Sequence, residues 1–173
     1  MNNKGFTLIE ILVYVGVLAI IISTASSFFL WAIRSNTKTK VMRETLDNAR
    51  RAMEIITYEI KEAKSIYIPT TTSTQLSLET THYLPQGENK TYIDFYLCGT
   101  ASTTLCFKKE SQDAVTLTSD RVEVKNLSFT QIATTSTSPS LQINLEISYK
   151  NPSNLPEYQA SVNLSSAASL RAY

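Results

Sequence analysis

The sequence has little of what an enzyme usually needs. It contains four glycines, two cysteines and one histidine, His82, in 173 residues. We find no Gly-rich phosphate loop, no His-Glu-x-x-His or Gly-x-Ser-x-Gly motif and no metal-spaced acidic cluster. Two cysteines and one distant histidine do not supply the four ligands of a zinc site. We therefore expect no catalytic residues, no metal, no cofactor and no small-molecule substrate.

The chain also lacks a strong field of charge of either sign. Sixteen Lys and Arg residues balance fifteen Asp and Glu residues, which gives a net charge of +1, and the two signs are intermixed along the chain. This composition does not favour nucleic acid as a partner, and it does not indicate an acidic disordered tail.

Long apolar runs are absent except at the N-terminus. The stretch from Phe6 to Ile33 has 28 residues and one charge, Glu10. A transmembrane helix needs roughly 20 apolar residues, so this stretch is long enough to span a bilayer. The alternative is a secretory signal peptide, but its apolar core usually has about 7–15 residues. Small residues at 23–27 resemble a cleavage site, yet the apolar run resumes at Phe28. The sequence therefore predicts one membrane crossing, over residues 6–33.

A specific junction opens this run. The first ten residues read Met1-Asn2-Asn3-Lys4-Gly5-Phe6-Thr7-Leu8-Ile9-Glu10. This segment resembles the type IV prepilin family, whose Gly-Phe-Thr-Leu-Ile-Glu hallmark it matches at all six positions. The resemblance implies that residues 1–5 are a leader peptide and that prepilin peptidase cleaves between Gly5 and Phe6. It also implies N-methylation of Phe6.

Glu10 is chemically unusual where it stands. A carboxylate inside an apolar helix costs up to a few kcal/mol at the bilayer centre, and such residues are usually functional. One interpretation is that Glu10 extends its carboxylate to the lipid headgroups. The other is that Glu10 is an assembly contact, which pairs with the positive amine that cleavage leaves at Phe6 of a neighbouring subunit.

The orientation of the span has two conflicting indications. Lys4 and the amino terminus precede the span, whereas four cations follow it closely: Arg34, Lys38, Lys40 and Arg43. A positive-inside count alone would leave the C-terminal part in the cytoplasm. The prepilin-like junction implies instead that the leader is cytoplasmic, and a cysteine pair favours an oxidising compartment. We therefore expect a single-pass inner-membrane precursor whose C-terminal part is exported and which later joins an extracellular filament.

Beyond Arg34 the apolar residues become periodic. They follow one another at steps of four and three residues: Met42, Leu46, Ala49, Met53, Ile56, Ile60, Ala63 and Tyr67. This stripe predicts an amphipathic helix over residues 34–68, continuous with the span as one helix from about Phe6 to about Ile66 and ended by Pro69. The stripe suits either a coiled coil or packing on the domain's own sheet, and we favour the sheet.

Ser23–Ser27 interrupt the apolar helix with small polar residues. Serine and threonine weaken helix interiors because their hydroxyls compete for backbone hydrogen bonds. Major pilins often carry a proline near this point, where this chain has Ser27. The segment has two alternative interpretations: the helix melts locally here on assembly, or these small residues form a face for helix packing.

Residues 69–173 predict a β-sheet domain, so the fold class is α+β, a pilin fold with about five to seven strands. The clearest strand alternates apolar and polar residues over Leu141–Tyr149. Val122–Ile132 alternates with a slip between Val124 and Leu127, which suggests a bulge. We expect further strands at 92–98, 105–108, 115–117, 158–164 and, more weakly, 75–79, with loops at 69–74 and 134–140.

Cys98 and Cys106 lie at the facing ends of two of these strands, with residues 99–104 as the hairpin loop between them. An even pair in an exported domain predicts a disulfide, and two free thiols are the alternative.

Weaker resemblances concern the kind of subunit. Residues 49–53 and 58–63, and the ending 169–173, resemble minor pilins of the PilW and type II secretion J-subunit group. They imply a structural subunit of a pilus or pseudopilus. Its expected partners are other pilin subunits, prepilin peptidase, the inner-membrane assembly machinery and, before assembly, membrane lipid. A membrane-anchored adhesin or DNA-binding pilin-like module is the alternative.

Overall fold

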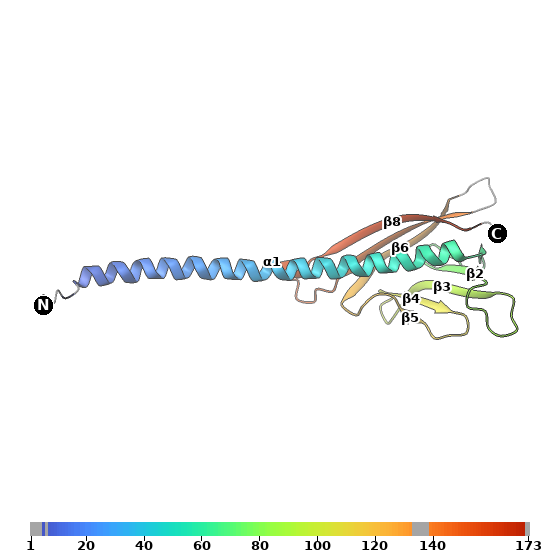
Figure 1. Ribbon diagram of the computed structural model, residues 1–173, viewed down its shortest axis with the longest axis horizontal. Helices are drawn as coiled ribbons and strands as arrows, with labels where there is room; N and C mark the ends of the chain where they lie inside the picture. The colour runs from blue at the N-terminus through green and yellow to red at the C-terminus, as the bar shows by residue number, and fades with distance from the viewer. Residues whose placement is uncertain (1–4, 6, 133–138, 172–173) are drawn as a thin grey trace.

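One long helix dominates the molecule. The computed structural model describes residues 5, 7–132 and 139–171, and its helix α1 runs without a break over Leu8–Glu62. The N-terminal part of α1 projects as a free rod, and the C-terminal part lies along the β domain (Figure 1). No proline occurs within α1, so nothing in its sequence removes a backbone hydrogen bond.

The end of α1 differs from the sequence prediction. The helix stops at Glu62, with Ala63 in an extended conformation as its C-cap, rather than near Ile66 or at 68. Ser65–Ile66 instead form strand β1, paired antiparallel with Leu78 and Glu79. Ile66 is β-branched, which favours extended backbone, and pairing with the sheet prevails over the helical period.

The first sheet has five antiparallel strands in chain order. These are β1, β2 (Leu76–Thr80), β3 (Thr91–Cys98), β4 (Thr104–Lys109) and β5 (Val115–Thr116). In β3 the side chains of Ile93 and Phe95 are buried and that of Asp94 between them is partly exposed, as an alternating strand with one covered face requires.

The second sheet has three antiparallel strands. They are β6 (Val122–Ile132), β7 (Ser140–Tyr149) and β8 (Ser161–Ser169), with a 3-10 turn η1 (Pro156–Tyr158) between β7 and β8. The predicted bulge is confirmed, because the register of β6 on β7 shifts between Val124 and Asn126. The last strand lies later than expected, and most of the predicted 134–140 loop falls outside the described residues. The eight described strands exceed the predicted five to seven.

The C-terminal half of α1 packs on β7 and β8, and both sheets contribute to one apolar core. The stripe therefore packs within its own domain, and not in a coiled coil. Ala49, Met53, Ile56 and Ile60 are buried as predicted. At the N-terminal end of the packed half of α1, the buried residues are Val41 and Thr45 in place of the stripe residues Met42 and Leu46. The reason is that a stripe with a period of 3.5 residues slowly rotates around a helix that has 3.6 residues per turn.

Candidate functional site

The N-terminus of α1 is closed by a reciprocal pair of side-chain contacts. Thr7 is the N-cap, and its Oγ1 accepts from the backbone N–H of Glu10 at 3.3 Å. The Glu10 Oε2 accepts in turn from the backbone N–H of Thr7 at 3.4 Å. This is a capping box, and the Thr-x-x-Glu spacing in the sequence was the signal that could have predicted it. Of the residues at the predicted cleavage site, the structure describes Gly5, whereas Phe6 and residues 1–4 lie outside the described residues.

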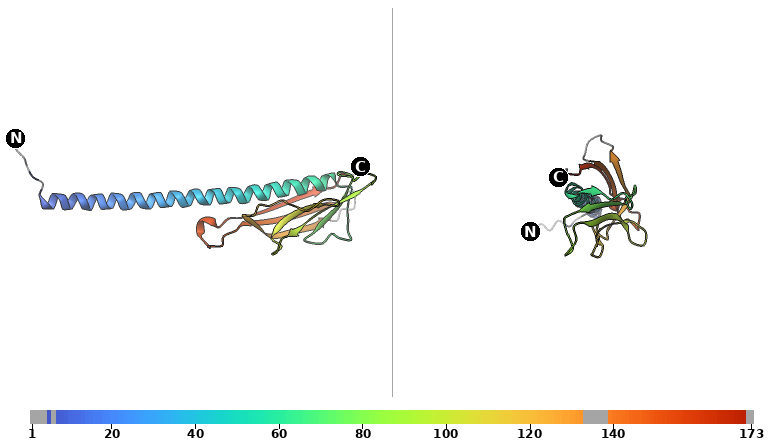
Figure 2. Two further views of the ribbon diagram at one scale, coloured as in Figure 1. Left: turned by 90° about the horizontal axis from the view of Figure 1, so that it is seen from below. Right: turned by 90° about the vertical axis from the view of Figure 1, so that its right-hand side faces the viewer.

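The side chains that follow the cap are exposed along the whole projecting half of α1. Leu8 is 83% exposed, and the most apolar 18-residue window has a mean hydropathy of 2.4 with none of its residues buried. By length and composition this helix is able to cross a membrane. Figure 2 shows that no other described segment lies beside the part of α1 that projects beyond the β domain and beyond the loop between β7 and β8. An apolar surface of this extent requires a cover, either lipid or other helices.

The polar residues within this segment do not interrupt the helix. The Ser23 hydroxyl donates to the carbonyl of Ala19 at 2.8 Å, and that of Ser27 donates to the carbonyl of Ser23 at 3.0 Å. Thr24 donates to the carbonyl of Ile21 at 2.9 Å. These bonds satisfy the hydroxyls within the helix itself, which suits an apolar surrounding.

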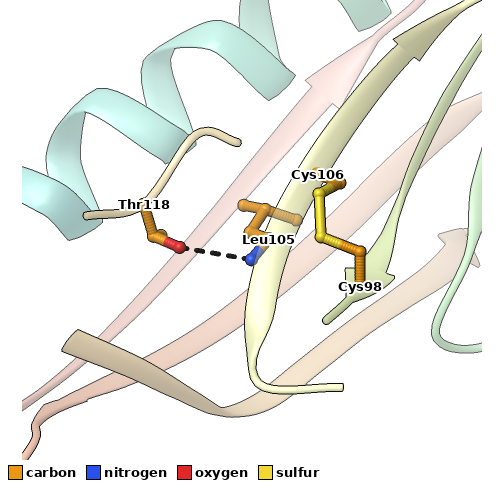
Figure 3. Close-up of a disulfide and its surroundings, with 4 residues drawn as sticks. All are labelled: Cys98, Leu105, Cys106 and Thr118. Carbon is orange, nitrogen blue, oxygen red and sulfur yellow. Dashed lines mark hydrogen bonds between the residues drawn. A yellow bond between two sulfur atoms is a disulfide. The ribbon is translucent and has the colours of Figure 1, made fainter. Parts of the chain in front are cut away.

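The two cysteines lie on neighbouring strands of the first sheet. Cys98 ends β3 and Cys106 lies within β4, and a disulfide joins them with their Cα atoms 5.9 Å apart (Figure 3). Cys98 is opposite Thr104 in the register, so the bond crosses the hairpin diagonally. Next to it the backbone N–H of Leu105 donates to Thr118 Oγ1 at 3.2 Å, which ties the segment after β5 to the same hairpin.

A cluster that the sequence did not indicate surrounds Glu59 of α1. Glu59 is only 4% exposed, and its Oε1 accepts from the Tyr83 hydroxyl at 2.9 Å. Its Oε2 has no hydrogen-bond partner among the described residues. Burial raises the pKa of Glu59, against smaller opposing effects of Tyr83, His82 and Lys109. The Lys109 Nζ lies 3.5 Å from the centre of the Tyr83 ring. Within the described ranges, no three His, Cys, Asp or Glu side chains gather as metal ligands.

A long helix with an apolar N-terminal half, followed by antiparallel sheets, defines an α+β, pilin-like architecture. Residues 1–26 match a family model described as the prokaryotic N-terminal methylation motif. No curated protein and no solved structure matches the chain. The motif and the exposed apolar helix together support a type IV pilin-like protein with a membrane-anchored precursor.

Proposed function

We propose that this chain is a structural subunit of an extracellular type IV pilus or pseudopilus. The observation that carries the proposal is that a methylation motif leads directly into a fully exposed apolar helix. In the precursor, lipid covers this helix. After prepilin peptidase removes residues 1–5 and Phe6 is methylated, the helices of other subunits replace the lipid. The C-terminal domain then faces outward on the filament.

Glu10 sets the axial register in this proposal. It lies four residues, or about 6 Å of helical rise, beyond the new amine at Phe6. In the free chain both contacts of its carboxylate to Thr7 use Oε2, and a carboxylate has about four acceptor positions. The capping box thus leaves Glu10 able to accept from an amine of a subunit staggered by about one turn. In low dielectric this pair removes two uncompensated charges together.

The proposed subunit is a minor one, of low abundance and near the filament tip or its priming complex. The support is the resemblance of residues 49–53, 58–63 and 169–173 to the PilW and type II secretion J-subunit group. A shaft subunit would instead be the most abundant protein of the filament.

Filaments sheared from cells test this function. We expect the protein in the sheared fraction, at low stoichiometry, with an intact mass that lacks residues 1–5 and carries one added methyl group. Absence from the filaments, or an N-terminus between Ala25 and Phe28, would contradict it. Filaments that form normally without the protein but fail to bind a surface or DNA would favour the adhesin or DNA-binding alternative.

A further inference from the structure

A hollow lies at the neck of the molecule, where α1 leaves the globular domain. It has a volume of about 390 Å³ and its lining is mainly apolar. One wall comes from α1 and the other from the loop between β7 and β8 that contains η1. The lining residues are Trp31, Arg34, Ser35 and Lys38 on the helix and Leu155, Pro156 and Glu157 on the loop. Figure 2 shows this loop reaching further along α1 toward the N-terminus than the strands do.

The loop wall is held in a defined shape. The Asn151 side chain donates to the carbonyl of Leu155 at 2.9 Å and accepts from the N–H of Leu155 at 3.0 Å. The Tyr158 ring stacks on Tyr149 of β7, with ring centres 6.1 Å apart. The Leu155 side chain is nevertheless 42% exposed. A fixed loop that presents an exposed leucine is organised in advance for an apolar contact.

Three charged groups face the same hollow. Arg34 and Lys38 contribute positive charges and Glu157 a negative one. In the part of the chain that the structure describes, none of the three forms an ion pair. Two cations on one wall and a carboxylate on the other match a ligand that carries both an anionic and a cationic group.

The position of the hollow along α1 is the level of a membrane surface. Trp31 lies 23 residues beyond Leu8, or about 35 Å along the helix axis. The hydrocarbon core of a bilayer is about 30 Å thick. When the apolar half of α1 spans a bilayer, Trp31 therefore lies near the headgroups, where tryptophan is enriched. Arg34, Lys38 and the loop then lie at the height of the phosphates.

We propose that this neck hollow binds the headgroup of a zwitterionic aminophospholipid of the phosphatidylethanolamine class. This inference rests on the membrane-inserted precursor of the proposed function. The lipid phosphate contacts Arg34 and Lys38, and its ammonium contacts Glu157. The glycerol and the first acyl carbons lie against Trp31 and Leu155. The site orients the domain on the membrane, and the lipid leaves when the subunit enters a filament.

Photo-crosslinking of the full chain in vesicles tests the site. A benzophenone amino acid replaces Leu155 in one variant and Leu84, which is 43% exposed and lies in the loop after β2, in the control. The vesicles contain equal parts of phosphatidylethanolamine, phosphatidylglycerol and phosphatidylcholine. We expect phospholipid adducts at position 155 and not at 84, enriched in phosphatidylethanolamine. Glu157→Gln should reduce that enrichment by about two- to fivefold, as expected for loss of one partly exposed ion pair.

The wild-type chain provides a second measurement, because Trp31 is its only tryptophan. Brominated phosphatidylethanolamine should quench Trp31 more strongly than equally brominated phosphatidylglycerol, and Glu157→Gln should remove the difference. No adduct at position 155, an adduct to a second copy of the chain, or no headgroup preference would overturn the site. Vesicle flotation separates the two proposals: a chain that does not float overturns the membrane-inserted precursor, whereas one that floats without these signals overturns only the lipid site.

Discussion

Glu10 and Glu59 are carboxylates on the same helix in opposite surroundings. Glu10 is exposed on an apolar rod, and Glu59 is buried under the loop that carries Tyr83. The sequence singles out Glu10 because no other charge lies between Phe6 and Ile33. It cannot single out Glu59, since a glutamate in the charged half of a helix looks like any solvated residue until the tertiary fold covers it.

Removal of the Glu10 charge should reduce incorporation into filaments. We expect Glu10→Ala and Glu10→Gln to leave membrane insertion and cleavage intact, because the apolar span and Gly5 are unchanged. Both variants should be depleted in sheared filaments by tenfold or more, on the order of the 1.4 kcal/mol or more that a desolvated ion pair contributes. Glu54→Gln, at an exposed position of the packed half, is the control. Wild-type recovery of either Glu10 variant would exclude Glu10 as the register contact.

The buried Glu59 predicts a distinctive pH dependence of folding. Burial raises its pKa above the ordinary value of 4.5, so the folded chain holds this proton more tightly than the unfolded chain. The free energy of unfolding therefore falls as pH rises from about 4.5 through the raised pKa. Glu59→Gln stays neutral and keeps an acceptor for Tyr83. It should be more stable than wild type at pH 7, and the difference should shrink toward pH 4.

Urea unfolding of the full chain in detergent micelles, followed by near-ultraviolet circular dichroism, measures this difference. The exposed Glu54→Gln variant is the control and should show no such trend with pH. A Glu59→Gln variant that is less stable than wild type at pH 7 would contradict the prediction.

At the scale of elements, α1 is one helix whose sequence changes near Arg34 from an apolar half to an amphipathic, periodic half. The apolar half and the periodic half could both be read from the sequence, because each has a strong pattern. The end of the helix could not, because the periodic stripe continues to Tyr67 while pairing with β2 extends the backbone at Ser65 and Ile66. A local pattern does not reveal the competition between a helical turn and pairing with strand residues 12 and 14 positions further along the chain.

The periodic half of α1 should carry much of the domain's stability. Ile56 is fully buried in the core, so Ile56→Ala should lower the free energy of unfolding by about 2–5 kcal/mol. Met42→Ala, at a position 39% exposed on the same helix, should cost far less. Urea unfolding in micelles compares the two variants, and equal effects would show that Ile56 does not lie on the packed face of α1.

The disulfide in the β3–β4 hairpin should contribute less to the free energy of unfolding than the buried face of α1 does. The bond closes a loop with a sequence separation of eight residues, for which the chain-entropy model gives about 2–3 kcal/mol. The double variant Cys98→Ala with Cys106→Ala should therefore fold, with a free energy of unfolding reduced by at most about that amount. Non-reducing peptide mapping of protein from the cell envelope should recover the two cysteines in one linked peptide pair, and free thiols would count against the bond.

At the scale of the whole molecule, the sequence predicts some features of the fold and not others. The α+β class, the packing of the helix on a sheet and most strands could be predicted, because they follow from local period and from the need to cover apolar faces. The division into two sheets, the turn η1 and the neck hollow could not. They depend on residues far apart in the chain coming together, such as Trp31 and Leu155, which line the same hollow.

The division of α1 into a projecting apolar half and a packed half predicts that the globular domain folds without the part of the helix that assembles into filaments. Buried residues of α1 begin at Val41, so a fragment of residues 35–173 retains the whole core cluster. We expect it to be soluble without detergent and to melt within about 3 °C of the full chain in micelles, a difference of about 1 kcal/mol or less. It should never enter filaments, because it lacks both the apolar rod and Glu10. A fragment that aggregates or loses its near-ultraviolet signal would show that the projecting half also stabilises the domain. One that is recovered from sheared filaments would place the assembly contacts in the globular domain instead.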